Sequence, residues 1–144
     1  MSVEQHKATV RRFFADFNKQ DLSTQPALIS PEYSLDFPGG PGTAHGLAGL
    51  RQATEAFIQS FPDLQFTVES VIAEGDEAAA TWTMSAHQQG NLGPLPGTGK
   101  AVVLTGTSFF TFRDGKIVHD RVRADMLGLL QQIGAMPAPA PAGL

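Results

Sequence analysis

The sequence contains no cysteine, one tryptophan and one tyrosine, and its 10 Lys and Arg stand against 14 Asp and Glu, which gives a net charge of −4. The absence of cysteine excludes disulfides, thiol nucleophiles and Cys-ligated metals, and it fits a reducing compartment, so we expect a cytoplasmic protein. Without a basic excess, nucleic acid is not an expected partner. No apolar run approaches the roughly 20 residues of a membrane-spanning helix, and "MSVEQHKATV" lacks the apolar core of a signal peptide. We therefore expect neither membrane insertion nor secretion.

Several familiar motifs are also incomplete. The segment "GTGK" departs from a phosphate-binding loop at two required positions. The segment "GTSFF" around Ser108 lacks the second glycine of a nucleophile elbow and lies inside an expected strand, which argues against a serine hydrolase. No two of the four histidines have metal-ligand spacing on one element, so we expect no metal site.

The length of 144 residues suits one domain, which we place at residues 1–135. The remaining residues, 136–144, contain "PAPAPAG", which supplies neither helix nor ladder hydrogen bonds. We interpret this segment as a flexible Pro/Ala tail.

Helical periodicity dominates the first half of the chain. Ser2 and Gln5 have the form of a capping box, and an apolar stripe then predicts a first helix near residues 3–18. Asp21 can cap a short second helix that ends at Pro31. Helical spacing returns from residue 47 and stops at Pro62, which predicts a third helix.

The second half of the chain alternates with a period of two. After a brief first strand over "EYSLDF", strands are expected near residues 64–72, 77–87, 100–112 and 116–124, with Ile72 on the apolar face of the first of these. The consecutive strands are joined by turns such as Asp114-Gly115, so the sheet is mainly antiparallel. The predicted class is α+β: a curved antiparallel sheet wraps over three N-terminal helices as a cone, with a pocket inside.

Strand parity divides the charged segment "KIVHDRVRA" at residues 116–124 into two faces. One face carries His119, Arg121 and Arg123 together with Ile117, and the other carries Val118, Asp120, Val122 and Ala124. A carboxylate among apolar neighbours is costly, and burial raises its pKa toward the range that suits proton transfer at neutral pH. Asp120 is thus the candidate acid, unless it pairs with an arginine across the sheet.

Asp125 has a structural explanation instead. A short helical stripe starts at Met126 and ends before Gly134, so Asp125 stands at the N-cap of a C-terminal helix. We favour the capping role over a catalytic one.

Three segments together resemble one known family. "FPDLQFTVESVIAEGDEAAATWTMSAHQQG", "GPLPGTGK" and "DGKIVHDRVRADMLGLLQQIG" are similar to the SnoaL-like polyketide cyclases of the nuclear-transport-factor-2-like superfamily. The resemblance implies a homodimer with a hydrophobic pocket for a small apolar or polyketide-like substrate. It also implies an ester cyclase of the lyase or isomerase type, which closes a ring by intramolecular aldol condensation without a cofactor, with an Asp as general acid/base.

The resemblance carries over to individual positions. The family's acid stands where this chain has Val122, often two places after a His where this chain has Asp120. Either Asp120 has taken over the role of the acid, or the family reaction is absent. A family His matches His87, a second candidate catalytic residue, and another matches Asp36, a candidate substrate-binding residue; the alternatives are a solvated strand end and a turn carboxylate. The expected pocket wall, which ordinary core packing would also explain, consists of Phe14, Phe57, Trp82 and Met84, with Val122 beside them.

Two other functions stay open. The first is a non-catalytic dimeric domain that binds a small ligand, which the loss of the family acid at Val122 favours. The second is an epoxide hydrolase of the limonene-epoxide-hydrolase type, which Arg121 and Asp125 resemble. That enzyme class also needs an Arg and an Asp on a neighbouring strand, and "AAATWTMSA" offers neither.

Overall fold

The computed structural model describes residues 2–137, so most of the predicted tail, from residue 138 on, lies outside the described residues. The helices are α1 (Val3–Asn18), a 3₁₀ turn (Leu22–Thr24), α2 (Gln25–Leu28), α3 (Gly46–Ser60) and α4 (Met126–Gln132). The strands are β1 (Ile29–Phe37), β2 (Gly42–His45), β3 (Gln65–Glu74), β4 (Glu77–His87), β5 (Ala101–Arg113) and β6 (Lys116–Ala124). Among the described residues, none of the helices has the length and apolar character that crossing a bilayer requires.

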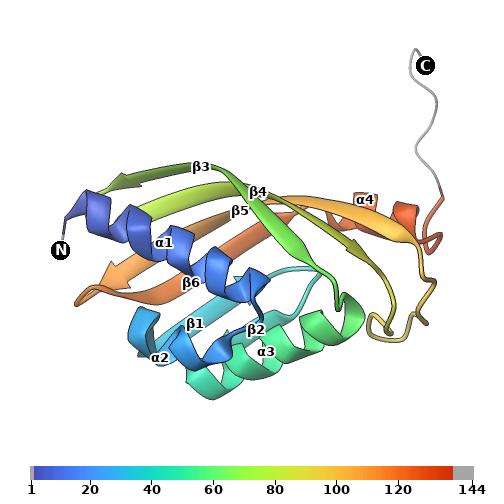
Figure 1. Ribbon diagram of the computed structural model, residues 1–144, viewed down its shortest axis with the longest axis horizontal. Coiled ribbons are helices and arrows are strands. Elements are labelled where there is room, and N and C mark those ends of the chain that lie inside the picture. Colours follow the sequence, from blue (N-terminus) through green and yellow to red (C-terminus); the bar gives the residue numbers. More distant parts are fainter. Residues whose placement is uncertain (1, 138–144) are drawn as a thin grey trace, which may run out of the picture.

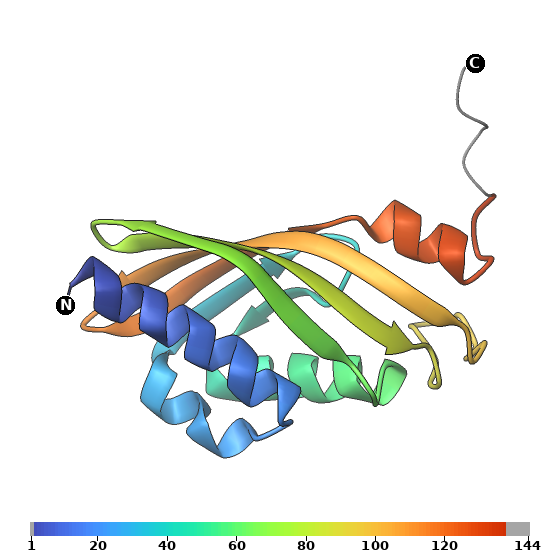
Figure 2. The ribbon, with the colours of Figure 1, turned by 45° about the horizontal axis from the view of Figure 1, so that its top comes forward.

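The strands form one curled, open sheet in the order β2-β1-β6-β5-β4-β3. Neighbouring strands are antiparallel except for β1 and β6, which pair in parallel. Helices α1 and α3 lie under one face of the sheet, with α1 along β3 and α3 along β1, while α4 packs on β5 away from them (Figures 1 and 2). The predicted α+β class with a mainly antiparallel, cone-shaped sheet is confirmed.

Helix α1 begins as its sequence predicts. The Ser2 hydroxyl accepts from the Gln5 N–H, and the Gln5 side chain accepts from the Ser2 N–H, which completes the capping box. Val10, Phe13 and Phe14 are buried on the side that faces the sheet. Of these, Phe13 and Phe14 also line the cavity described below.

The predicted second helix is shorter than expected. Asp21 caps the 3₁₀ turn. Helix α2 then begins with Pro26 in its first turn, where a backbone N–H would have no intrahelical acceptor. Ile29 and Pro31 then belong to β1 and not to the helix. The chain therefore leaves the helical region earlier and makes the first strand longer than "EYSLDF".

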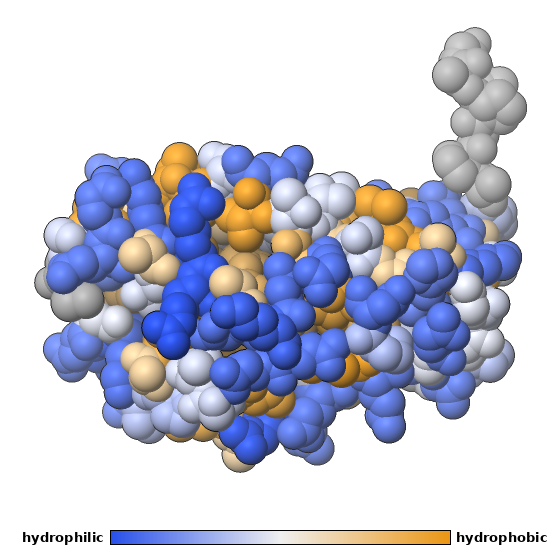
Figure 3. Space-filling view, viewed as in Figure 1, coloured by the Kyte–Doolittle hydropathy of each residue, from blue (hydrophilic) through white to orange (hydrophobic). Residues whose placement is uncertain are grey.

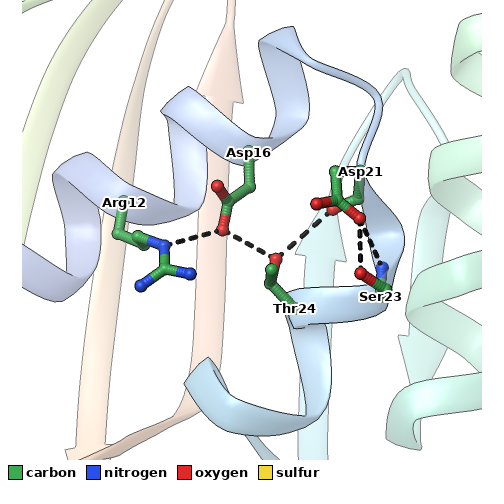
Figure 4. Close-up of polar contacts among 5 residues, drawn as sticks. All are labelled: Arg12, Asp16, Asp21, Ser23 and Thr24. Carbon is green, nitrogen blue, oxygen red and sulfur yellow. Dashed lines mark hydrogen bonds and ion pairs between the residues drawn. The ribbon is translucent and has the colours of Figure 1, made fainter.

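The junction of α1 with the 3₁₀ turn contains a buried carboxylate, Asp16, which is 8% exposed. Its Oδ2 accepts from Arg12 Nε at 3.1 Å and from the Thr24 hydroxyl at 2.7 Å (Figure 4). The Thr24 hydroxyl also lies 3.3 Å from the Asp21 carbonyl oxygen. These contacts tie α1 to the turn that follows it.

A β-bulge in β3 corrects the predicted face of Ile72. The register with β4 shifts between Val68 and Ser70, so one extra residue reverses the parity of the rest of the strand. Ile72 is consequently 67% exposed, while Val71 and Ala73 pack against the core.

A second bulge lies near the start of β6. Ile117 pairs with Phe112 and His119 pairs with Thr111, which leaves Val118 without an opposite residue. Ile117 is therefore buried, not on the outer face, and Val118 is only half-buried, which corrects the prediction for both. Beyond the bulge the predicted parity holds, because Asp120 is buried and Arg121 is exposed.

The C-terminal helix α4 is capped as predicted. The Asp125 carboxylate accepts from the Gly128 N–H at 2.9 Å, and Gly134 follows the helix with a φ of 83°. A Cβ at Gly128 would lie 2.2 Å from the Asp125 carboxylate, so the cap requires glycine there. The Gln132 side chain holds α4 to β5, since it hydrogen-bonds both the N–H and the carbonyl of Val103.

Candidate active site

A cavity lies between the inner face of the sheet and helices α1 and α3. It has a volume of about 70 Å³, several times the roughly 10–15 Å³ that one water occupies on this measure. Most of its lining is aromatic or aliphatic. On the face of the molecule shown in Figure 3, hydrophobic residues reach the surface in separate patches among hydrophilic ones. The lining residues are Phe13, Phe14, Phe17, Tyr33, Leu35, Phe37, Pro41, Leu50, Ala53, Thr54, Phe57, Phe66, Trp82, Ser108, Asp120 and Val122.

Four polar side chains form a row across the inner face of the sheet, one on each of four neighbouring strands. They are Tyr33 on β1, Asp120 on β6, Ser108 on β5 and Trp82 on β4. Each one takes an inward position in a strand whose apolar residues alternate with exposed ones, so the register of the sheet brings them together. Each of the four is at most 3% exposed.

Asp120 is the acid of this row. The Tyr33 hydroxyl donates to its Oδ2 at 3.1 Å. Its Oδ1 is the single buried side-chain N or O atom within residues 2–137 that has no hydrogen-bond partner. Burial raises the pKa of Asp120 to about 7, against the opposing effect of the Tyr33 hydrogen bond. The neighbouring strand residues Arg121 and Arg123 point to the outer face, so Asp120 forms no ion pair with them.

The partner of Asp120 is a buried phenol. Burial, followed by the charge of Asp120 and their hydrogen bond, raises the pKa of Tyr33 well above its usual value. Tyr33 therefore stays protonated and keeps donating to the carboxylate. This arrangement fixes Oδ2 and leaves Oδ1 as the oxygen of Asp120 without a protein partner.

The second half of the row is the pair of Trp82 and Ser108. The indole Nε1–H donates to the Ser108 hydroxyl oxygen at 3.0 Å. The indole packs on Gly106, where a Cβ would come within 2.5 Å of the ring. Gly106 thus leaves the space in β5 that the Trp82 ring fills.

The structure places most of the predicted pocket residues in the cavity. Phe14, Phe57, Trp82 and Val122 line it together with Asp120. Met84 is different, because its side chain is fully buried in the core and does not line the cavity. The core interpretation is the correct one for Met84.

His87 lies away from the cavity. Its side chain is 49% exposed at the end of β4, and its Nδ1 lies 2.6 Å from Asp63 Oδ2. Hydrogen bonds from the His87 backbone and side chain lower the pKa of Asp63. The family match implied a pocket-lining position for His87, but the outward parity of β4 takes its side chain to the surface, which is the solvated strand end given as the alternative.

Asp36 is also on the outer face. Its Oδ2 accepts from Arg123 Nη2 at 3.0 Å, and both side chains are partly exposed. The inward positions of β1 belong to Tyr33, Leu35 and Phe37. The pocket position that the family comparison suggested for Asp36 is wrong for the same reason of parity.

The two residues that resembled an epoxide hydrolase do not meet. The Arg121 guanidinium lies 4.5 Å from the centre of the Phe109 ring on the outer face, and Asp125 caps α4. Neither residue lines the cavity. In the part of the chain that the structure describes, no three or more His, Asp or Glu side chains gather as a metal-binding group.

Sequence reasoning missed Tyr33 and Ser108. The segment "EYSLDF" alternates apolar and polar residues, and this pattern places Tyr33 inside and Asp36 outside. Ser108 continues an inward row in β5 that includes Leu104 and Phe110. Both residues were therefore within reach of the parity argument that identified Asp120.

The cone-shaped fold and the buried acid in an aromatic cavity define a class of α+β domains that enclose an apolar pocket. The chain belongs to the SnoaL-like polyketide cyclase family, whose sequence profile matches residues 8–133. Among proteins with curated functions, none has a significantly similar sequence.

Solved structures agree with this assignment. A candidate SnoaL-like polyketide cyclase from Jannaschia sp. CCS1 shares the fold, with a TM-score of 0.84 at 23% identity, over 93% of this chain and 94% of that one. AclR from Streptomyces galilaeus, a candidate hydroxylase, has a TM-score of 0.84 and 29% identity over 96% of this chain and 87% of its own. IdmH from Streptomyces antibioticus, a candidate polyketide cyclase, has a TM-score of 0.79 and 27% identity over 90% of this chain and 99% of its own.

Proposed function

We propose that this protein is a cofactor-free enzyme of the polyketide-cyclase type, in which Asp120 is the general acid/base of an aldol-type cyclisation or a related proton transfer. The observation that carries the proposal is the unpartnered Oδ1 of Asp120 in an aromatic cavity. A carboxyl group is retained at such a cost when it has a function.

The chemistry follows from the surroundings of Asp120. With a pKa of about 7, the carboxyl group is present in both protonation states near neutral pH, which suits a group that removes a proton and later returns it. The aromatic walls exclude water and so strengthen the electrostatic interactions of the carboxylate with a substrate. Oδ1 takes the proton alpha to a substrate carbonyl and delivers it to the alkoxide that forms on ring closure.

Position 122 distinguishes this chain from the family members whose acid stands there. Val122 and Asp120 both line the cavity, two residues apart on the same face of β6. A carboxyl group at position 120 therefore reaches the same space from the neighbouring inward position. In this proposal the acid has moved along the strand, and Val122 has become part of the apolar wall.

Carbon-acid exchange tests the proposal without knowledge of the natural substrate. Candidate ketones and esters are incubated in D₂O with the protein, and deuterium incorporation alpha to the carbonyl is followed by NMR. Replacing Asp120 with Asn keeps the shape and removes the base, so we expect exchange to fall roughly 10²-fold or more. Asp36→Asn changes an acid of the outer face and is the matched control, expected to exchange at the wild-type rate.

Exchange that does not depend on Asp120 would remove it from the mechanism. If the folded Asp120→Asn variant binds the same compounds and wild-type protein exchanges none of them, the domain is a small-ligand binder, the alternative that the loss of the family acid favours. Circular dichroism of both variants establishes that they are folded.

We also infer that the protein is a homodimer. The support is the family resemblance together with the exposed Ile72 and Val103, apolar residues that a partner could cover. Native mass spectrometry reports the dimer mass and any retained small ligand, and a monomeric mass at micromolar concentration contradicts the inference.

A further inference from the structure

We infer that Ser108 is a second catalytic residue, whose hydroxyl binds the carbonyl oxygen of an enolisable ketone or ester while Asp120 removes the alpha proton. This inference rests on the proposed function, which it deepens by naming the oxygen-binding group and the substrate class. No motif in the sequence assigns Ser108 this role.

The positions of the two residues suit one substrate. Asp120 pairs with Phe110 across β5 and β6, and Ser108 pairs with Val122, so Asp120 and Ser108 are diagonal neighbours on the same face. Diagonal neighbours in an antiparallel pair stand about 7 Å apart at Cα. Their side chains converge on the same cavity, so one can reach a carbonyl oxygen and the other the carbon beside it.

The hydrogen bond from Trp82 determines how Ser108 can act. An indole N–H is only a donor, so it occupies a lone pair of the Ser108 oxygen and leaves the hydroxyl hydrogen free. Within the described residues, the one hydrogen bond of Ser108 Oγ is the bond it accepts from Trp82, and it donates to no protein acceptor. Accepting one hydrogen bond also strengthens the donor power of a hydroxyl group. The Ser108 hydroxyl is therefore free to donate into the cavity.

Gly106 is part of the same arrangement. The Trp82 ring lies where a side chain at position 106 would stand, with a Cβ there only 2.5 Å from the indole. The missing side chain leaves room for the indole over β5, where its Nε1 reaches Ser108. Gly106 and Trp82 are accordingly positioning residues for the Ser108 hydroxyl.

Asp120 and Ser108 together account for every bond that breaks or forms in the proton transfer. The alpha C–H bond breaks, its proton forms a bond to Asp120 Oδ1, and its electron pair forms the C=C bond of the enolate. The carbonyl π pair moves to the oxygen, where the Ser108 hydroxyl donates a hydrogen bond to the developing negative charge. In the reverse step the proton returns to carbon. In cyclisation the C=C pair of the enolate instead forms the new C–C bond to a second carbonyl of the substrate, the π pair of that carbonyl moves to its oxygen, and Asp120 Oδ1 gives the proton to this alkoxide.

The lining also limits the substrate class. Among the described lining residues there is no Lys, Arg or His, while aromatic rings surround the polar row. A carboxylate or phosphate on the substrate would meet no cation inside the cavity and would approach the Asp120 carboxylate. The expected substrate portion is thus neutral, flat and apolar, with the enolisable carbonyl as its polar group.

The first test is deuterium exchange with Ser108→Ala. Loss of one donor to the enolate oxygen is expected to slow exchange about 10²-fold. Ser108→Cys should exchange at a rate between those of the wild type and Ser108→Ala, because a thiol is a weaker donor than a hydroxyl. Thr107→Ala removes a hydroxyl from the outer face of the same strand and is expected to leave the rate unchanged.

The second test measures oxygen binding without turnover. Fluorine NMR titrations compare 4-fluorophenol, whose hydroxyl oxygen stands in for the enolate oxygen, with fluorobenzene, which lacks it. The affinity for 4-fluorophenol should fall about tenfold in Ser108→Ala, the loss of roughly one hydrogen bond, while that for fluorobenzene stays the same. Gly106→Ala, which displaces Trp82, should give a smaller loss of the same selectivity.

The outcomes separate this inference from the proposed function. If wild-type exchange depends on Asp120 but Ser108→Ala exchanges normally, the role of Ser108 is wrong and the proposed function stands. If the wild type exchanges nothing, the proposed function fails, and the ratio of the two fluorinated ligands alone decides whether Ser108 binds the ligand oxygen. Equal losses for both ligands would indicate a changed cavity shape and would overturn the inference.

Discussion

Two buried carboxylates in this protein lie in opposite surroundings. Asp16, at the junction of α1 and the 3₁₀ turn, accepts hydrogen bonds from Arg12 and Thr24 (Figure 4). Asp120, on the inner face of β6, has a neutral phenol on one oxygen and no partner on the other. The burial of the two residues is similar, at 8% and 3% exposed. Their partners differ, and the partners decide whether a buried acid stabilises the fold or is held ready for chemistry.

The largest expected effect is on the pH dependence of stability. Asp120 has a pKa of about 7 in the folded protein, against 3.8 for an ordinary Asp, so the unfolded chain loses this proton first as the pH rises. The contribution of Asp120 to stability is complete below pH 4 and is lost progressively up to about pH 7. The pKa difference corresponds to about 4 kcal/mol. Because Asn has no proton to lose, Asp120→Asn should gain that much unfolding free energy relative to wild type between pH 4 and pH 8.

Urea unfolding of both proteins at pH 4, 5.5, 7 and 8 checks this prediction. The difference between variant and wild type is the informative quantity, because other titrating groups cancel in it. A difference that stays constant with pH would mean that Asp120 titrates normally and that the cavity does not isolate it from water.

Replacing the junction carboxylate, Asp16, should destabilise the fold, whereas replacing Asp120 stabilises it near neutral pH. Asp16→Ala removes the acceptor of two hydrogen bonds at a buried site, so we expect the unfolding free energy at pH 7 to fall by about 2 kcal/mol. Most of the loss should come from Thr24, because the Arg12 side chain is 59% exposed and an exposed ion pair contributes little. A double-mutant cycle with Arg12→Ala and Thr24→Val separates the two contributions, and a stabilised Asp16→Ala variant would contradict the comparison.

The same contrast explains which parts of the site could be predicted from sequence. Capping and alternation are local rules, and they identified the Ser2 cap, the Asp125 cap and the inward position of Asp120. The partner of Asp120 was not visible, because Tyr33 reaches it through the parallel pairing of β1 with β6, between residues 87 apart in the chain. Nothing in a local pattern specifies that register.

Bulges limited the strand predictions in the same way. The extra residues, Glu69 and Val118, are ordinary strand residues, so no Gly or Pro in the sequence marks either bulge. One bulge turned Ile72 outward, and the other turned Ile117 inward. For Asp36 and His87, positions inferred from the family disagreed with strand parity, and parity was correct.

A third carboxylate gives the smallest expected effect and completes the comparison. Asp36 pairs with Arg123 on the outer face, where the two side chains are 38% and 60% exposed. Water screens such a pair and side-chain entropy opposes it, so Asp36→Asn should change the unfolding free energy by less than about 0.5 kcal/mol, measured by urea unfolding at pH 7. Deuterium exchange should match that of the wild type, since Asp36 does not reach the cavity. If Asp36→Asn slowed exchange as strongly as Asp120→Asn, the outer face would take part in the reaction, and the separation of structural from reactive carboxylates by the two faces of the sheet would fail.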